Sequence, residues 1–236
     1  MEKLIRDAQL KLLGAFAGAG GSFALAGGTA LELYYLQHRF SRDLDFFSPE
    51  YKTEEIKAIV KLFSAVLGSP VKLESELNAS NKASVRFYTV KIRGAPAPLK
   101  IDFIEDVFFK RPTITKFGGV PVYSAKNIYF QKIMTLIGSF LITDAIGREI
   151  PAGRKEVRDI VDIYYLSKKI EPLHKFLKTL GRQYQRGVIQ WYRGYSRQDV
   201  KLGMLDLNLY DKEFDISAMI AYLDAEIRAF MAEEIR

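Results

Sequence analysis

Residues 27–45 read GGTALELYYLQHRFSRDLD, and this stretch decides how the whole chain is interpreted. A glycine-rich turn opens an apolar segment that predicts a helix, and Asp43 and Asp45 follow at the start of a predicted strand, LDFF (44–47). Side chains two residues apart on a strand point to the same face, so the two Cα atoms lie about 6–7 Å apart. Two carboxylates this close repel each other unless a positive group sits between them, and a divalent metal ion is the natural partner.

The turn itself is suited to a phosphate. Gly27 and Gly28 allow a ligand to approach the backbone, and Thr29 stands where a helix N-cap belongs. N–H groups at the start of a helix favour an anion, and the Thr29 hydroxyl adds another donor for a triphosphate. A phosphate site followed by a metal site indicates nucleotide chemistry.

A third acid lies on a later strand. Asp102 stands inside LKIDFI (99–104), whose other side chains favour burial, and an ionised carboxylate there is costly unless it is paired or binds a metal. If this strand lies beside LDFF, then Asp43, Asp45 and Asp102 converge. Three carboxylates can hold the two metal ions of an in-line phosphoryl transfer, and Asp102 is placed to act on the attacking hydroxyl as metal ligand or base.

Composition limits the choice of metal. The chain of 236 residues has no cysteine and only two histidines, His38 and His174, so thiolate sites are excluded and a histidine zinc site is not expected. An oxygen-binding ion, Mg²⁺ or Mn²⁺, is expected instead. The net charge is +7, and residues 103–201 carry 18 basic and 9 acidic side chains, so a polyanion would be attracted there.

Residues 12–31 carry no charge, but six of them are glycine, which makes them poor membrane material. We therefore expect a cytoplasmic protein with no membrane association.

The order of elements predicts an α/β (α+β) fold. Helices are expected over 2–16 and 56–68, with strands at 23–26, 44–47, 71–77, 83–92, 99–104 and 119–124. Helical patterns then cover 126–140, 155–168, 172–186 and 216–235, with a less regular stretch at 187–210. The sequence thus predicts a mixed-sheet catalytic lobe over 1–122 and a helical lobe over 123–236.

These motifs together resemble the AbiEii/AbiGii toxin family within the DNA polymerase β-like nucleotidyltransferases. The resemblance rests on Gly-Gly-Thr-x-Leu and Arg-x-Ser-x-Asp-hydrophobic-Asp, a Lys before Leu-Lys-x-Asp, and a helical Lys before Arg-Asp-x-x-Asp. Here these are Gly27, Gly28, Thr29 and Leu31; Arg39, Ser41, Asp43 and Asp45; Lys82, Leu99, Lys100 and Asp102; and Lys132 (with Lys126 as competitor), Arg158, Asp159 and Asp162.

The resemblance implies a nucleotidyltransferase that uses Mg²⁺ or Mn²⁺ and an NTP donor such as ATP. Some members of the family place nucleotides on tRNA ends, so RNA is the expected acceptor and a type IV toxin–antitoxin system the expected setting, with the antitoxin as a separate chain. Lys82 would steady the triphosphate, Arg39 and Ser41 would belong to the nucleotide site, and Lys132 and Asp159 would shape the nucleotide or acceptor side.

Simpler interpretations stay open for each residue. Asp43 and Asp45 can face solvent at a strand end, and Arg39 can pair with either of them. Asp102 can pair with Lys82 or Lys100. Lys82 can be a solvated strand-edge residue, and the charges of 158–162 can form surface pairs on one helix. The same fold can also act on a small molecule or a protein hydroxyl, or bind RNA or a partner without catalysis.

A basic and aromatic segment is the expected acceptor surface. Residues 168–201 hold nine basic and two acidic side chains, with tyrosines and Trp191 among them. Arginines can grip phosphates while aromatic rings stack on unpaired bases. A solvated helix face above core aromatics is the alternative.

Overall fold

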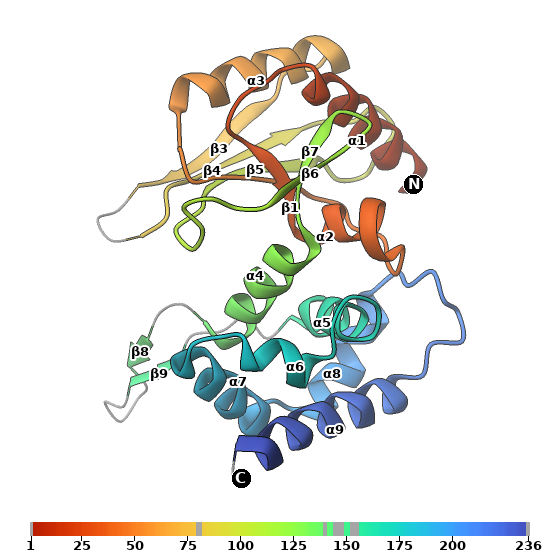
Figure 1. Ribbon diagram of the computed structural model, residues 1–236. Coiled ribbons are helices and arrows are strands. Elements are labelled where there is room, and N and C mark those ends of the chain that lie inside the picture. Colours follow the sequence, from red (N-terminus) through yellow and green to blue (C-terminus); the bar gives the residue numbers. More distant parts are fainter. Residues whose placement is uncertain (1, 79–81, 139–140, 144–148, 152–155, 235–236) are drawn as a thin grey trace. The chain divides into compact units, whose positions relative to one another are not determined.

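The protein, seen in a computed structural model, divides into two compact units (Figure 1). The structure describes residues 2–78, 82–138, 141–143, 149–151 and 156–234. Unit 1 comprises Met1–Tyr35 and Ser41–Ser124, and unit 2 comprises Leu36–Phe40 and Ala125–Arg236. A short segment between the glycine turn and the Asp-x-Asp strand thus belongs to the second unit, which a division at 122/123 does not anticipate.

Unit 1 is built on a seven-stranded mixed sheet in the order β3-β4-β5-β2-β1-β7-β6. The β2–β5 and β1–β7 pairs are parallel and the other four pairs are antiparallel. The strands are β1 (Ala24–Ala26), β2 (Leu44–Ser48), β3 (Lys72–Leu77), β4 (Val85–Val90), β5 (Leu99–Glu105), β6 (Ile114–Phe117) and β7 (Val120–Tyr123). The predicted mixed α/β fold is confirmed, and β6 is a strand that the sequence analysis missed.

Two helices, α1 (Glu2–Ala17) and α3 (Thr53–Leu67), cover one face of this sheet (Figure 1). The ring centroids of Phe16 and Phe63 lie 4.5 and 5.8 Å from that of Phe46 on β2, and Phe46 stacks on Phe103 of β5 at 5.4 Å. Each fully buried phenylalanine contributes about 1.5–3 kcal/mol relative to an exposed one. Because strand side chains alternate, the residues next to Phe46 and Phe103 point to the opposite face.

The glycine turn leads into an unusual helix. The α-helix α2 (Gly27–Ala30) passes directly into a π-helix, η1 (Leu31–Leu36), and Gln37 then has a positive φ of 50°. The rings of Tyr34 and Tyr35 both contact Phe117, at 4.9 and 5.4 Å between centroids. The amphipathic helix expected here therefore exists, but most of it is wider than an α-helix.

Unit 2 is mainly helical. Its elements are α4 (Ala125–Ile137), the hairpin β8 (Leu141–Thr143) and β9 (Glu149–Pro151), α5 (Val157–Lys169), α6 (Leu173–Lys178), α7 (Arg182–Gly194), α8 (Arg197–Gly203), the 3₁₀ turn η2 (Met204–Asp206) and α9 (Ile216–Glu234). The hairpin was not expected, and α7 and α8 occupy much of the stretch predicted to be irregular. Predicted helix residues 139–140, 155 and 235 lie outside the described residues.

The single helix predicted over 172–186 is wrong, because the chain breaks it between α6 and α7. Gln185 donates its side-chain amide to the carbonyls of Leu177 (3.1 Å) and Leu180 (2.9 Å). Gly181 is extended and serves as the N-cap of α7. The carbonyls that a continuous helix would satisfy internally are thus satisfied by a side chain.

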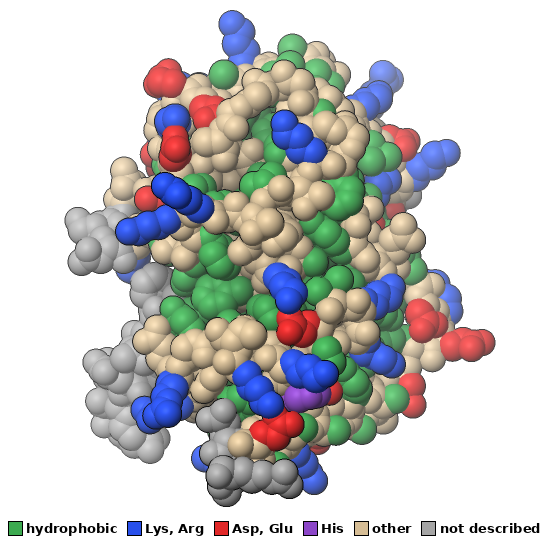
Figure 2. Space-filling model, in the orientation of Figure 1, with side chains coloured by type: hydrophobic (Ala, Val, Ile, Leu, Met, Phe, Trp, Pro, Cys, Tyr) green, Lys and Arg blue, Asp and Glu red, His purple; other side chains and the backbone are tan. Residues whose placement is uncertain are grey.

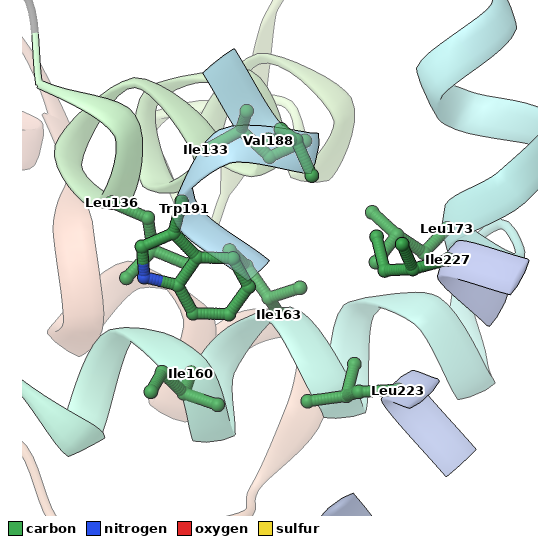
Figure 3. Close-up of a pocket in the computed structure, with 9 residues that line it drawn as sticks. All are labelled: Ile133, Leu136, Ile160, Ile163, Leu173, Val188, Trp191, Leu223 and Ile227. Atoms are coloured by element: carbon green, nitrogen blue, oxygen red, sulfur yellow. The ribbon is translucent and has the colours of Figure 1, made fainter. Parts of the chain in front are cut away.

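The core of unit 2 contains a small apolar cavity (Figure 3). Aliphatic side chains from five helices and Trp191 line it: Ile133, Leu136, Ile160, Ile163, Leu173, Val188, Leu223 and Ile227. Its volume is about 10 Å³, roughly the space of one water molecule, so it is a packing defect and not a ligand site.

No helix in the described part of the chain is long and apolar enough to cross a membrane. The uncharged residues 12–31 instead form the end of α1, strand β1 and the glycine turn.

Candidate functional site

Two of the predicted acids lie side by side on the face of the sheet opposite α1 and α3. Asp45 of β2 is the register partner of Asp102 of β5, and the two strands are parallel. Partners in a parallel register point to the same face, and neighbouring strands lie about 4.8 Å apart. Both residues are half-buried, whereas their neighbours Phe46 and Phe103 are fully buried on the other face. The predicted adjacency of LDFF and LKIDFI is therefore present.

The Asp45 carboxylate also lies against the glycine turn. Ala26, the last residue of β1, is the register partner of Asp45 on its other side, so Gly27 begins directly beside it. A Cβ at Gly27 would lie 2.1 Å from Asp45 Oδ2, and Gly27 has a φ of +67°. Both the conformation and the close contact require glycine here. The glycine turn and the Asp45 carboxylate are therefore in direct contact. The sequence pattern indicated only that they lie close together along the chain.

Thr29 has a different local role from the predicted one. The prediction that it caps the helix is wrong, because α2 begins at Gly27 with Ala26 as its N-cap. Thr29 is fully buried, and its hydroxyl donates to the backbone carbonyl of Asp43 at 2.5 Å. It joins the glycine turn to the start of the Asp-x-Asp segment.

Asp43 is half-buried and lies just before β2, two residues from Asp45. Within the part of the chain that the structure describes, no group of three or more His, Cys, Asp or Glu side chains is arranged to hold a metal ion. The structure thus brings two of the three predicted acids into register, and the third, Asp43, lies two residues before Asp45.

The remaining residues predicted in unit 1 are Lys82 and Ser41. Lys82 is exposed and lies three residues before β4, the strand that pairs with β5. Ser41 is buried at 8% exposure, and its backbone N–H and C=O are both hydrogen bonded by side chains.

Unit 2 holds a buried cluster of charged side chains around Asp162 on α5. The guanidinium of Arg39 makes a two-pronged contact, from Nε to Oδ1 (2.7 Å) and from NH2 to Oδ2 (2.8 Å). Lys132 of α4 lies 2.8 Å from Asp162 Oδ2 and 2.6 Å from Asp159 Oδ1. The His38 Nε2 lies 2.7 Å from Asp162 Oδ1. Three of the predicted residues, Arg39, Lys132 and Asp159, therefore meet here.

The ionisation of this cluster follows from its charges. Burial alone would raise the pKa of Asp162, but Arg39 and Lys132 hold it well below its usual value. Burial lowers the pKa of His38 and outweighs its hydrogen bond to Asp162. Burial would also lower the pKa of Lys132, but Asp162 and Asp159 raise it. Two cations thus face two carboxylates, with a neutral imidazole beside them.

The segment that carries His38 and Arg39 is also fixed through its backbone. Arg39 forms an isolated bridge with Leu209, Phe40 N–H donates to the Asn208 carbonyl at 2.9 Å, and Tyr210 N–H donates to the His38 carbonyl at 3.1 Å. These contacts explain why Leu36–Phe40 belongs to unit 2.

Of the two lysines considered for the helical position, Lys132 is the buried one. Its side chain is 11% exposed, whereas that of Lys126 is 63% exposed and pairs with Glu171 at 2.8 Å. Arg158 pairs with Glu156, and its side chain is 37% exposed.

Three buried polar residues that hold these motifs, Gln9, Glu32 and His38, have no part in the sequence motifs described above. The sequence offers two signals: Gln9 lies on the apolar face of α1, and Glu32 lies within an apolar helix. Neither residue belongs to a recognisable sequence motif.

The basic and aromatic segment forms α7 and α8, and its rings are used within unit 2. Trp191 lines the apolar cavity and stacks on Tyr195 at 4.7 Å. Arg197 lies 5.0 Å from the Tyr195 ring centroid and 3.0 Å from Asp224. The arginines at 182, 186 and 193 are exposed. On the face shown in Figure 2, lysine and arginine side chains are dispersed among neutral and hydrophobic ones.

Comparison with known proteins identifies the family and the fold. The model of a family described as the nucleotidyl transferase AbiEii toxin of type IV toxin–antitoxin systems matches residues 11–233. A comparison with curated proteins found no match.

Among solved structures, the chain is similar to one from H. pylori described as a candidate nucleotidyltransferase, with 16% identity and a TM-score of 0.60 over 98% of this chain and 96% of that one. It is also similar to JHP933 from Helicobacter pylori, with 14% identity and a TM-score of 0.57 over 97% and 93% of the two chains. At these identities, the two structures establish the fold.

Proposed function

This chain belongs to the AbiEii nucleotidyl transferase toxin family of type IV toxin–antitoxin systems, and on that premise we propose that it transfers a nucleotidyl group from an NTP to an RNA end. The observation that carries the proposal is the register of Asp45 with Asp102 beside Gly27. It joins a carboxylate pair to a turn whose backbone a phosphate can approach.

The donor set fits a hard divalent cation. Asp45 and Asp102 offer oxygen ligands on one face of the sheet, and Mg²⁺ is commonly held by one or two carboxylates together with substrate phosphates and water. These two residues, joined by Asp43, would hold Mg²⁺ or Mn²⁺. When bound, the ion would neutralise charge on the triphosphate and lower the pKa of the attacking hydroxyl.

The chemistry is an in-line displacement at the α-phosphorus. A bond forms between the acceptor hydroxyl oxygen and the α-phosphorus, the bond to the β-phosphate oxygen breaks, and pyrophosphate leaves. Asp102 takes the hydroxyl proton, either directly or through water. The other residues mainly bind and orient the reactants.

Phosphate contacts come from the turn and from lysine. The backbone around Gly27 and Gly28 can approach the triphosphate, and exposed Lys82 supplies a mobile positive charge. Thr29 acts by fixing the backbone before the acids, and the backbone N–H of Ser41 is itself held by Glu32. The Arg39–Lys132–Asp159 cluster serves the nucleotide or acceptor side.

The acceptor surface is proposed on α7 and α8. Exposed arginines at 182, 186 and 193 offer phosphate contacts on one helix. Because the rings of Trp191 and Tyr195 stack on each other, charge contributes more to this surface than base stacking. Binding should therefore weaken steeply with salt.

The test uses purified protein, total tRNA, Mg²⁺ and each NTP labelled in turn at the α- or γ-phosphate. The proposal expects RNA labelled from the α-position of at least one NTP, no label from any γ-position, and no labelling by Asp102→Asn. RNA that stays unlabelled with all four nucleotides would count against an RNA acceptor. Label on protein or on a small molecule would move the acceptor to that class. An antitoxin is the partner that the family implies, and it is tested by coexpressing a neighbouring reading frame.

A further inference from the structure

Side chains from three helices hold the backbone of residues 41–43, directly before the carboxylate pair. Glu32 of η1 accepts a hydrogen bond from the Ser41 N–H through Oε2 at 2.8 Å. Gln9 of α1 donates its side-chain amide to the carbonyls of Ser41 (3.1 Å) and Arg42 (2.8 Å). Thr29 donates to the carbonyl of Asp43. Four of the six backbone N–H and C=O groups of residues 41–43 are thus bonded by side chains.

These side chains are buried and charge-balanced. Gln9 and Thr29 are fully buried, and Glu32 is 2% exposed. The Glu32 carboxylate pairs through Oε1 with Arg6, which lies one turn before Gln9 on the same face of α1. A buried carboxylate is costly to desolvate, and it is satisfied here by one guanidinium and one backbone N–H. The covering helix α1 is therefore tied to the segment that begins the Asp-x-Asp motif.

We propose that Gln9 and Glu32 are positioning residues for the catalytic carboxylates, acting through the backbone of residues 41–43. The inference rests on the proposed nucleotidyl transfer. Residues 41–43 lie directly before β2, which begins at Leu44. The side chains that bond this segment therefore help to set the direction of Asp43 and the start of the strand that carries Asp45. An acid displaced by 1 Å can slow catalysis by about 10²-fold.

Gln9 offers the sharpest substitution, because glutamate has the same shape but replaces the donor with an acceptor. In Gln9→Glu, two carbonyl oxygens would face a carboxylate and the segment would be pushed away. In Gln9→Met the two donors are lost without repulsion. Tyr123→Phe is the matched control, because it removes one buried hydrogen bond, to Asp106 (2.8 Å), from the same unit without touching residues 41–43.

The experiment measures kcat, the KM for the NTP and the half-saturating Mg²⁺ concentration for these variants, with thermal unfolding alongside. We expect kcat to fall by about 10-fold in Gln9→Met and about 100-fold in Gln9→Glu, with the KM for the NTP changed by less than about threefold. The half-saturating Mg²⁺ concentration should rise in both variants. Tyr123→Phe should keep kcat even where it unfolds at a lower temperature.

A pH series adds a readout that loss of stability alone would not produce. Burial raises the pKa of a glutamate at position 9, and the protonated carboxyl regains one donor. The ratio of Gln9→Glu to wild-type activity should therefore rise as the pH falls, while the ratio for Gln9→Met stays flat.

Two results separate this inference from the proposed function. Absence of transferase activity in the wild-type protein would refute the proposed function. The positioning role of Gln9 is then tested by Mn²⁺ titration followed by electron paramagnetic resonance, in which Gln9→Met must bind the ion more weakly than the wild type. The inference would be overturned if folded Gln9→Met kept the kcat and the Mn²⁺ affinity of the wild type. If Gln9→Glu does not fold, Gln9→Met alone decides between the two outcomes.

Discussion

Replacing Gly27 with alanine tests the contact between the glycine turn and Asp45, the proposed metal ligand. The new Cβ would lie 2.1 Å from Asp45 Oδ2, so the carboxylate would have to retreat by more than about 1 Å to reach the 3.4 Å at which ordinary contact begins. The φ of +67° adds a left-handed backbone strain of about 1–2 kcal/mol for a residue with a Cβ. We expect Gly27→Ala to lose about 10²-fold in kcat and about 1–3 kcal/mol in free energy of unfolding.

Gly68 provides the matched control. It ends α3 with a φ of +60°, and no atom lies within 4 Å of a Cβ added there. Gly68→Ala therefore introduces the same backbone strain without moving Asp45, and it should lower stability by about 1–2 kcal/mol while kcat stays unchanged. Both variants would be measured by urea unfolding and by transfer of α-labelled nucleotide. Equal activities in the two variants at comparable stability would refute the claim that the Gly27–Asp45 contact positions the acid.

Further predictions concern the charged cluster of unit 2. Asp162→Asn leaves two buried cations without their shared carboxylate and should destabilise the protein by about 3–5 kcal/mol in urea unfolding. Glu54→Gln, which breaks an exposed pair with Lys57, should change stability by less than about 1 kcal/mol, and similar losses in the two variants would mean that the cluster is not a buried network. The pKa of His38 is lower in the folded chain than in the unfolded chain. As the pH falls below about 6.5, the unfolded chain therefore binds a proton at His38 before the folded chain does, and the free energy of unfolding decreases. His38→Gln should show less of this loss between about pH 6.5 and 5, and an unchanged pH profile of unfolding would contradict the assignment. Neutralising the arginines at 182, 186 and 193 should weaken tRNA binding and flatten its salt dependence, with NTP binding retained; an unchanged salt slope would place the acceptor elsewhere.

The unit 1 motifs were predictable from the sequence because their signals are local. Alternation of apolar residues defines LDFF and LKIDFI as strands, and the candidate acids Asp45 and Asp102 are the polar exceptions within them. The side-by-side position of Asp45 and Asp102 followed once the two strands were assumed to pair. The register itself depends on packing of Phe46 against Phe103, which no local pattern encodes.

Other features depended on tertiary contacts and were not predictable. The insertion of Leu36–Phe40 into unit 2 rests on a long-range bond of Arg39 to Asp162, 123 residues later. The break between α6 and α7 rests on Gln185, whose side chain replaces helical hydrogen bonds. Thr29 has the residue type of an N-cap, yet it is buried and bonds the carbonyl of Asp43, just before β2, instead of its own helix.

We propose that Asp45 and Asp102 jointly hold a divalent ion on the face of the sheet opposite α1 and α3. The most direct measurement is Mn²⁺ titration of the wild type, Asp45→Asn and Asp102→Asn in the presence of a nonhydrolysable NTP, followed by electron paramagnetic resonance. The account predicts tight Mn²⁺ binding by the wild type and a loss of at least about tenfold in affinity in each variant, with no loss of folded structure. Equal affinities in all three proteins would contradict it.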